Sequence, residues 1–233
     1  MIKIANLKKQ FGETIACNIP SFKVSDGDVL GLVGNNGAGK TTLFRMMLDL
    51  LKPDKGQVSL NGINPALSED WKKDTGACID ESFLIDYLTP EEYFAFLGKI
   101  GGIAQTEVDN RLGDFERFAG GEVFGQKKLI RNLSAGNKQK VGIIAALLRK
   151  PRLVVLDEPF NFLDPTSQNV LKHLLTDYNK STGATILISS HNLQHTIDIS
   201  TRIALLEKGR IIKDLTNVEG SAKEELADYF GGE

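Results

Sequence analysis

A glycine-rich segment early in the chain contains the residue types that hold phosphate groups. Residues 34–41 read Gly-Asn-Asn-Gly-Ala-Gly-Lys-Thr and fit the pattern G-x-x-x-x-G-K-[ST]. Glycines allow the backbone to turn so that its N–H groups converge on phosphate oxygens. Lys40 adds a positive charge for the β- and γ-phosphates, and the Thr41 hydroxyl suits Mg²⁺. The predicted phosphate-binding residues are Gly34, Asn35, Asn36, Gly37, Ala38, Gly39, Lys40, Thr41 and Thr42.

Two acidic residues end an apolar run later in the chain. Residues 153–156 are Leu-Val-Val-Leu, which predicts a strand buried on both faces, and Asp157 and Glu158 follow directly. Parallel sheets bind their ligands at the carboxyl ends of such strands. We therefore expect Asp157 to hold Mg²⁺ through water, and Glu158 to act as general base on an attacking water molecule.

Strand and helix patterns alternate around both motifs. The glycine-rich segment lies between an apolar run at 29–33 and a helical pattern at 42–48, the context that the motif requires. Further strands are predicted at 2–4, 22–24, 58–60, 185–188 and 203–206, and further helices near 168–180 and 193–199. Asn61-Gly62 predicts a hairpin turn after the strand at 58–60. The alternation predicts an α/β fold with a mainly parallel sheet covered on both faces.

Residues 83–150 differ from the rest and are predicted to be a helical insertion. Thr89 and Glu92 form a capping box at the start of the first helix, with Pro90 at its first position. Ser134 is a suitable N-cap for the third helix. The predicted helix ends are Gly101-Gly102, Gly120-Gly121 and Lys150-Pro151.

Composition excludes several classes of protein. The 233 residues are 41% hydrophobic and 25% charged, as in a soluble globular protein. The 28 basic and 30 acidic residues give a net charge of −2, so no overall basic excess indicates nucleic-acid binding. Two cysteines cannot form a disulfide framework, which indicates a reducing compartment. Lysines interrupt the apolar residues of 1–9, so we expect no signal peptide there, and no apolar stretch reaches the roughly 18 residues that a membrane-spanning helix needs.

The segment Leu133-Ser134-Ala135-Gly136-Asn137 completes a resemblance to a known family. With the glycine-rich loop and the acidic strand, it resembles the nucleotide-binding subunit of an ABC (ATP-binding cassette) transporter. The resemblance implies a P-loop NTPase of ABC type, with an N-terminal antiparallel β part beside the parallel core. It also implies one ATPase domain over 1–233, with its core at 1–82 and 151–233 and a helical signature subdomain at 83–150.

The resemblance assigns roles to further residues. Phe11 matches the aromatic residue that stacks on adenine, and His191 matches the switch histidine that touches the γ-phosphate. Ser134, Ala135 and Gly136 match the signature that contacts the γ-phosphate held by the other subunit. Asp164 belongs to residues 161–164, which match the loop that crosses between subunits.

Three positions depart from the family pattern. Where the family has a glutamine, this chain has Cys78-Ile79-Asp80-Glu81, so that Asp80 or Glu81 takes its place. A carboxylate there can reach Mg²⁺ through water, but it repels the γ-phosphate more than an amide does. The signature has Ala135 where glycine is common and Asn137 where glutamine is common. Phe162 replaces a residue that is usually small.

The resemblance implies an ATPase that uses ATP and Mg²⁺ and powers a membrane transporter. Two such subunits pair head-to-tail, as a homodimer or with a related subunit, beneath a permease on a separate chain. This places the chain on the cytoplasmic face of the membrane, without insertion and without nucleic acid. The short insertion and the loop at Asp80-Glu81 resemble those of exporter-type subunits, which energise permeases for drugs, antibiotics or lipids. Two alternatives stay open: a soluble assembly or translation factor, and a nucleotide-gated binding module with incidental hydrolysis.

Overall fold

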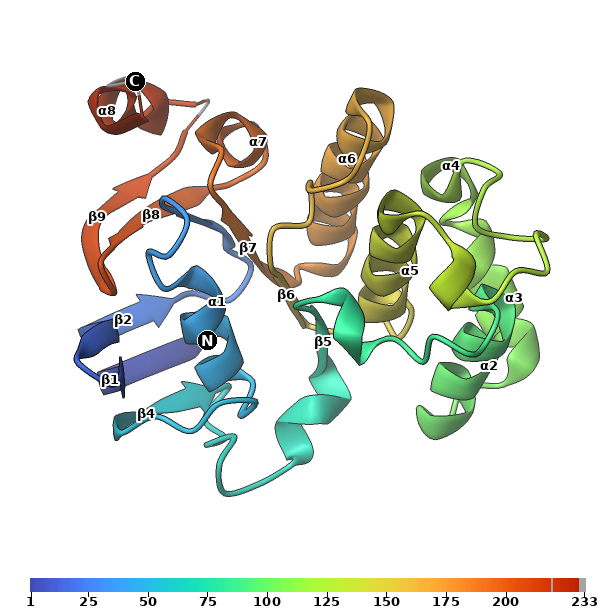
Figure 1. Cartoon of the computed structure of the whole chain (residues 1–233), viewed down its shortest axis with the longest axis horizontal. Helices are drawn as coiled ribbons and strands as arrows, with labels where there is room; N and C mark the ends of the chain where they lie inside the picture. Colours follow the sequence, from blue (N-terminus) through green and yellow to red (C-terminus); the bar gives the residue numbers. More distant parts are fainter. Residues whose placement is uncertain (219, 231–233) are drawn as a thin grey trace.

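Two β-sheets form the frame of the molecule (Figure 1). The computed structural model describes residues 1–218 and 220–230, apart from the side chains of residues 81, 227, 228 and 230. The strands are β1 (Ile2–Phe11), β2 (Thr14–Val24), β3 (Val29–Val33), β4 (Lys55–Leu60), β5 (Thr75–Cys78), β6 (Leu153–Leu156), β7 (Thr185–Ser190), β8 (Arg202–Glu207) and β9 (Arg210–Thr216).

Helices cover the sheets and form a separate group beyond β5 and β6 (Figure 1). The α-helices are α1 (Lys40–Met47), α2 (Pro90–Ile100), α3 (Gln105–Gly113), α4 (Glu116–Ala119), α5 (Ala135–Leu147), α6 (Pro165–Thr182), α7 (Leu193–Ile197) and α8 (Ala222–Phe230). Three short 3-10 helices are η1 (Asp70–Asp74), η2 (Glu81–Phe83) and η3 (Ile130–Asn132). Within residues 1–218 and 220–230, no helix is long and apolar enough to cross a membrane.

The larger sheet has the strand order β5-β6-β7-β3-β8-β9. Its first five strands run parallel, and β9 pairs antiparallel with β8, which confirms the predicted parallel core. Strand β7 lies between β3 and β6. The loops that follow these three strands therefore meet at one edge of the sheet, as expected for a ligand site.

Helix α1 fills the space between the two sheets. The smaller sheet has the antiparallel order β2-β1-β4, and its apolar face packs with that of the larger sheet. Leu43, Phe44 and Met47 of α1 are buried in this shared core. Burial on this scale stabilises the position of the helix, since each such side chain contributes roughly 1.5–3 kcal/mol. The start of α1 is thereby fixed next to the end of β3.

The opposite face of the larger sheet packs against the other helices. In β6, Leu153 and Val155 face α1, while Val154 and Leu156 contribute to a second core with α2–α6. This two-faced burial explains why the strand is a continuous apolar run. In Figure 1, α2–α5 (green to yellow) lie together on the far side of β5 and β6.

Most predicted elements are confirmed, with several differences. The capping box of Thr89 and Glu92 forms as predicted. The single helix predicted to end at 120–121 is instead two helices, α3 and α4. The turn at Asn61-Gly62 forms, with φ values of 51° and 87°, but only the bridge from Leu60 to Ile63 follows it. Strand β5 and helix α8 were not predicted. Strand β5 is four residues long and has no apolar periodicity that would have marked it.

Both cysteines lie in the protein interior. Burial raises the pKa of the Cys17 thiol to about 12. The pKa of Cys78 is also raised to about 12, by burial and by the nearby charges of Asp157 and Asp80. Because the thiolate is the reactive form, thiols with such raised pKa values are protonated and inert at pH 8.

We therefore expect iodoacetamide to modify neither cysteine of the folded protein at pH 8. Both should react in denaturant, where burial is lost and the ordinary pKa of about 8.5 returns. Mass spectrometry of the intact chain counts the added groups. Rapid modification of Cys17 in the native protein would contradict its burial in the described structure.

Candidate functional site

The glycine-rich loop depends on glycine at two close backbone contacts. A Cβ added to Gly39 would lie 2.2 Å from the carbonyl oxygen of Ala16, and its φ of 106° disfavours any other residue. A Cβ on Gly34 would lie 2.2 Å from the carbonyl oxygen of Leu206. With glycine before it, α1 begins without a capping side chain. Its first N–H groups are therefore suited to bind an anion.

Lys40 lies inside the loop rather than on its surface. Its side chain is 6% exposed, and its ammonium group donates a hydrogen bond of 2.6 Å to the carbonyl oxygen of Gly34. The same ammonium lies 3.2 Å from the Glu158 Oε1 atom. The sequence-predicted phosphate lysine and the predicted general base are therefore in direct contact.

Asp157 forms the base of the site at the end of β6. Its carboxylate accepts hydrogen bonds from the hydroxyls of Thr41 and Ser189. Burial raises the pKa of Asp157 above its usual range, against the opposite effect of these hydrogen bonds. A hydroxyl and a buried carboxylate oxygen in contact are the hard oxygen donors that Mg²⁺ prefers. The donor set at Thr41 and Asp157 therefore fits Mg²⁺.

Glu158 contacts Lys40 of α1, Ser189 of β7 and His191, the residue that follows β7. Its Oε2 atom lies 2.8 Å from His191 Nδ1, while its Oε1 atom contacts Lys40. Its backbone has a φ of 48°, a left-handed conformation that costs a residue other than glycine roughly 1–2 kcal/mol. The Glu158 N–H donates a 2.8 Å hydrogen bond to Ser189 Oγ, which helps to hold this conformation. The structure thus brings Lys40, Glu158 and His191 together, in the segments that follow β3, β6 and β7.

A cavity of about 280 Å³ opens beside this cluster. It is lined by residues of α1, of the loops after β5 and β6, and of the start of α5: Thr41, Arg45, Ile79, Asp80, Ala135, Gln139, Asp157, Glu158, Asn161 and Phe162. Its polar wall carries three carboxylates and one guanidinium group. The cavity is therefore the space in which a phosphate group bound at the loop would meet the acidic residues.

Asp80 lies in the cavity wall and is already paired. Its carboxylate lies 2.8 Å from Arg45 Nη2, and it accepts hydrogen bonds from the N–H and hydroxyl of Ser82. Its predicted role as a ligand of Mg²⁺ stays a prediction. Glu81, the alternative at this position, has its side chain outside the described residues.

The signature residues lie at the start of α5. Ser134 is the N-cap, and its hydroxyl accepts a 3.2 Å hydrogen bond from the N–H of Asn137. Ala135 lines the cavity. A Cβ on Gly136 would lie 2.6 Å from the Phe162 carbonyl oxygen, so glycine is required where the loop after β6 crosses this helix.

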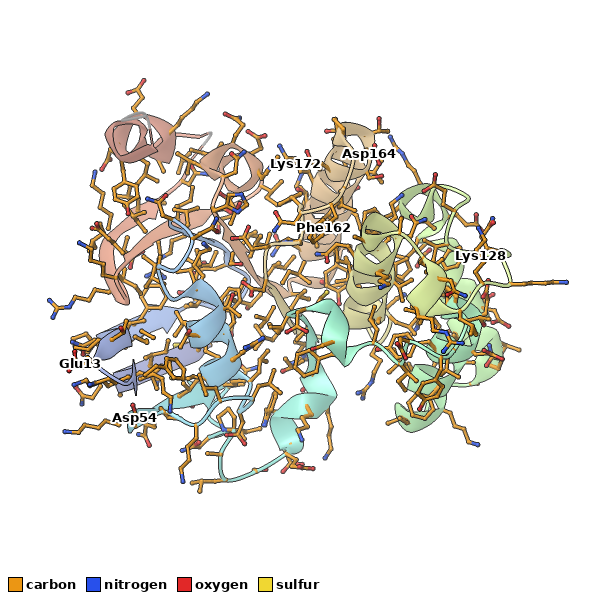
Figure 2. The ribbon with its side chains drawn as sticks, in the orientation of Figure 1. Glu13, Asp54, Lys128, Phe162, Asp164 and Lys172 are labelled. Carbon is orange, nitrogen blue, oxygen red and sulfur yellow. The ribbon has the colours of Figure 1, made fainter. Side chains whose placement is uncertain are left out.

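Phe162 and Asp164, in the loop between β6 and α6, are exposed. Phe162 is 74% exposed and has a φ of 63°. Figure 2 shows it and Asp164 on the loop that leads into α6. Asp164 caps α6 by accepting a 3.0 Å hydrogen bond from the Ser167 N–H, and it is not part of the cavity wall. Its contact with nucleotide across a subunit boundary stays a prediction.

Phe11 lies at the end of β1, in the hairpin that joins β2. Its ring is 51% exposed, and the Lys9 ammonium lies 5.5 Å from its centroid. Ala16 of β2, a few residues along the same hairpin, contacts Gly39 of the phosphate loop. An exposed ring in this hairpin is suitable for stacking on a nucleotide base, and that role of Phe11 stays a prediction.

Ser189 and Arg45 are among the residues of the site that sequence reasoning missed. Ser189 contacts both acidic residues, and its only sequence signal is its place two residues before His191. Arg45 pairs with Asp80, and it lies five residues after Lys40 on α1. Neither contact follows from the spacing of residues along the chain, since both join distant segments.

Comparison with known proteins agrees with this arrangement. A model of the ABC transporter family matches residues 17–161. The chain is 35% identical over 222 residues to the bacitracin transport ATP-binding protein BcrA of Enterococcus faecalis, covering 92% of this chain and 69% of that protein. It is 32% identical over 219 residues to the methionine import ATP-binding protein MetN of Rhizobium johnstonii, covering 92% and 60%.

Solved structures share the fold. The structure of an ATP-binding subunit of an ABC transporter superposes with a TM-score of 0.83 at 26% identity, covering 99% of this chain and 93% of that chain. The dimeric ATP-binding cassette MJ0796, bound to ADP and Pi, has a TM-score of 0.83 at 24% identity and covers 94% and 99%. The family match and the sequence relatives together show that this chain belongs to the ABC transporter family, in which it is an ATP-binding ATPase subunit.

Proposed function

We propose that this chain hydrolyses ATP to power an exporter-type transporter for a drug, an antibiotic or a lipid. The observation that carries the proposal is the contact of Glu158 with both Lys40 and His191, next to the pair of Thr41 and Asp157. These groups lie at the carboxyl ends of β3, β6 and β7, where the phosphate loop begins.

Each residue of the cluster has its own role in the proposed hydrolysis. Lys40 and the start of α1 bind the phosphates of ATP. Glu158 accepts a proton from water, whose oxygen then bonds to the γ-phosphorus as the bond to the β-phosphate oxygen breaks. His191 holds the Glu158 carboxylate in place through the 2.8 Å contact. The products are ADP and inorganic phosphate.

Mg²⁺ fits at Thr41 and Asp157, where it would neutralise charge on the phosphates. Ser189 positions the Asp157 carboxylate by donating a hydrogen bond to its other oxygen. The buried position of Asp157 strengthens its attraction to a cation, because water screens charges poorly there.

Dimerisation is the second part of the proposal. The dimer would place the signature residues 134–136 of one subunit at the phosphate loop of the other, and residues 161–164 at the contact between them. This assigns residues 83–150 as a helical subdomain that carries the signature and residues 1–82 and 151–233 as the core. Loss of the γ-phosphate removes the shared contact, so the pair opens after hydrolysis.

Light scattering on the Glu158→Gln variant tests dimerisation. Because the variant retains ATP, we expect roughly twice the 25.5 kDa mass of one chain in ATP and Mg²⁺, and the single-chain mass in ADP. A single-chain mass in both nucleotides would contradict pairing of two copies and leave a related subunit as the partner.

An apolar groove next to β5 is the proposed docking place for the permease. Its volume is about 400 Å³, and its walls come from η1, β5, η2, α2 and α5, with exposed rings such as Phe83 (52% exposed) at the edge. Its lining includes Asp80, which also lines the cavity beside Glu158. A permease segment bound here would therefore sense changes at the nucleotide site, on the cytoplasmic face of the membrane.

The direction of transport rests on sequence similarity. The 35% identical relative is named for bacitracin transport, whereas the methionine import relative is 32% identical. The similarity to the bacitracin protein supports the exporter type. Export of bacitracin from vesicles containing the chain and its permease would support this part of the proposal, and uptake of bacitracin into the same vesicles would contradict it.

A further inference from the structure

The wall of the cavity beside Glu158 contains an ion pair between Arg45 and Asp80. Arg45 Nη2 and Asp80 Oδ2 lie 2.8 Å apart, and no second contact between the two groups is present among the described residues. Arg45 comes from α1, whose first residue is Lys40, whereas Asp80 follows β5 and precedes η2. The pair therefore joins the helix that carries the phosphate lysine to the segment that leads into α2.

The charges in the cavity explain why such a pair matters. Asp80, Asp157 and Glu158 all line it, and Arg45 is the one cation among its described lining residues. A nucleoside triphosphate bound at the loop adds its own negative charges to the same space. Without Arg45, the Asp80 carboxylate would repel the terminal phosphate.

Asp80 is held as the charged form in this position. Burial acts to raise the pKa of Asp80, but hydrogen bonds from Ser82 and Arg45 outweigh it and lower the pKa. The Asp80 side chain is one-third exposed and Arg45 is 43% exposed, so both groups remain accessible from the cavity. The carboxylate is thus negative, partly desolvated and compensated by one partner on α1.

We propose that Arg45 is a positioning residue that neutralises Asp80 and so permits the γ-phosphate to enter the cavity. Arg45 on α1 and Asp80 after β5 then form a nearly neutral polar pair in the cavity wall. The inference rests on the proposed function, because it concerns ATP at the same site. It predicts that loss of Arg45 weakens the binding of ATP more than that of ADP, since ADP lacks the phosphate that approaches Asp80.

The test is the binding of ATP and of ADP by calorimetry, in EDTA so that no divalent metal supports hydrolysis. In Arg45→Met, we expect the Kd for ATP to rise about tenfold and the Kd for ADP to stay within about twofold. Retained ADP binding also shows that the variant is folded. Arg45→Lys should stay near wild type, since a single contact needs only a positive charge.

The double variant makes the test specific for charge. Asp80→Asn removes the charge that Arg45 compensates, so Arg45→Met combined with Asp80→Asn should recover ATP binding to within about threefold of wild type. Arg111→Met is the matched control, because it breaks an ion pair with Glu107 on α3, outside the cavity. It should change the affinity for neither nucleotide.

Two results would overturn the inference. Equal weakening of ATP and ADP in Arg45→Met would indicate a purely structural role for the pair, and so would a double variant that fails to recover. If the wild type binds neither nucleotide, the proposed function fails and the inference fails with it. If the wild type binds ATP and Arg45→Met shows no selective loss, the inference alone fails.

Discussion

Replacing Glu158 by Gln is expected to abolish most ATP turnover while ATP binding persists. The amide keeps the shape of the side chain but cannot accept a proton from water, a loss of about 10²–10⁴-fold for a general base. The exchange also removes the negative charge 3.2 Å from Lys40, which leaves that ammonium free to bind phosphate. Affinity for ATP should therefore stay equal or increase.

Phosphate release and ATP binding are measured on the same preparations to test this result. Glu107→Gln is the matched control, because it makes the same exchange in an ion pair with Arg111 on α3. The control should retain wild-type turnover. Wild-type turnover in Glu158→Gln would instead show that another group activates the water.

Replacing Lys40 by Met is expected to remove ATP binding itself. The buried ammonium is placed by its 2.6 Å hydrogen bond to the Gly34 carbonyl oxygen, so no other side chain takes its position. Loss of a charged hydrogen bond, together with the uncompensated charge of Glu158, should weaken ATP binding by about 100-fold or more.

The matched control for this variant is Lys172→Met. Lys172 pairs with Asp198 at 2.6 Å and lies on α6, away from the phosphate loop (Figure 2). Its loss should leave ATP binding unchanged, whereas the thermal midpoints of both variants report on folding. Nearly normal ATP affinity in Lys40→Met would contradict the placement of the phosphates at this loop.

The main parts of the site were predictable because each follows a buried strand. The apolar runs of β3, β6 and β7 are recognisable in the sequence, and parallel strands bring their carboxyl ends to one edge. The loop at 34–41, the acidic pair at 157–158 and His191 are therefore neighbours. The resemblance to a family supplied their roles, and the structure supplied their contacts.

Other features depend on contacts that the sequence does not encode locally. The pairing of Arg45 with Asp80 joins α1 to the segment after β5, a strand too short to show a pattern. The split of the second predicted helix into α3 and α4 places Phe115 and Phe118 in the core, where their burial outweighs continuation of one helix. Such features are decided by packing between distant elements.

Purifying Glu158→Gln protein from native membranes in ATP and Mg²⁺, and identifying what remains bound, tests most directly whether ATP at this site drives a membrane permease. We expect a protein with several membrane-spanning helices. Adding Phe83→Glu at the edge of the groove should release it, whereas adding Leu67→Glu, at a residue 83% exposed and outside the groove, should not. Recovery of soluble partners alone, with dimers still forming in ATP, would contradict the transporter function and favour a soluble assembly factor.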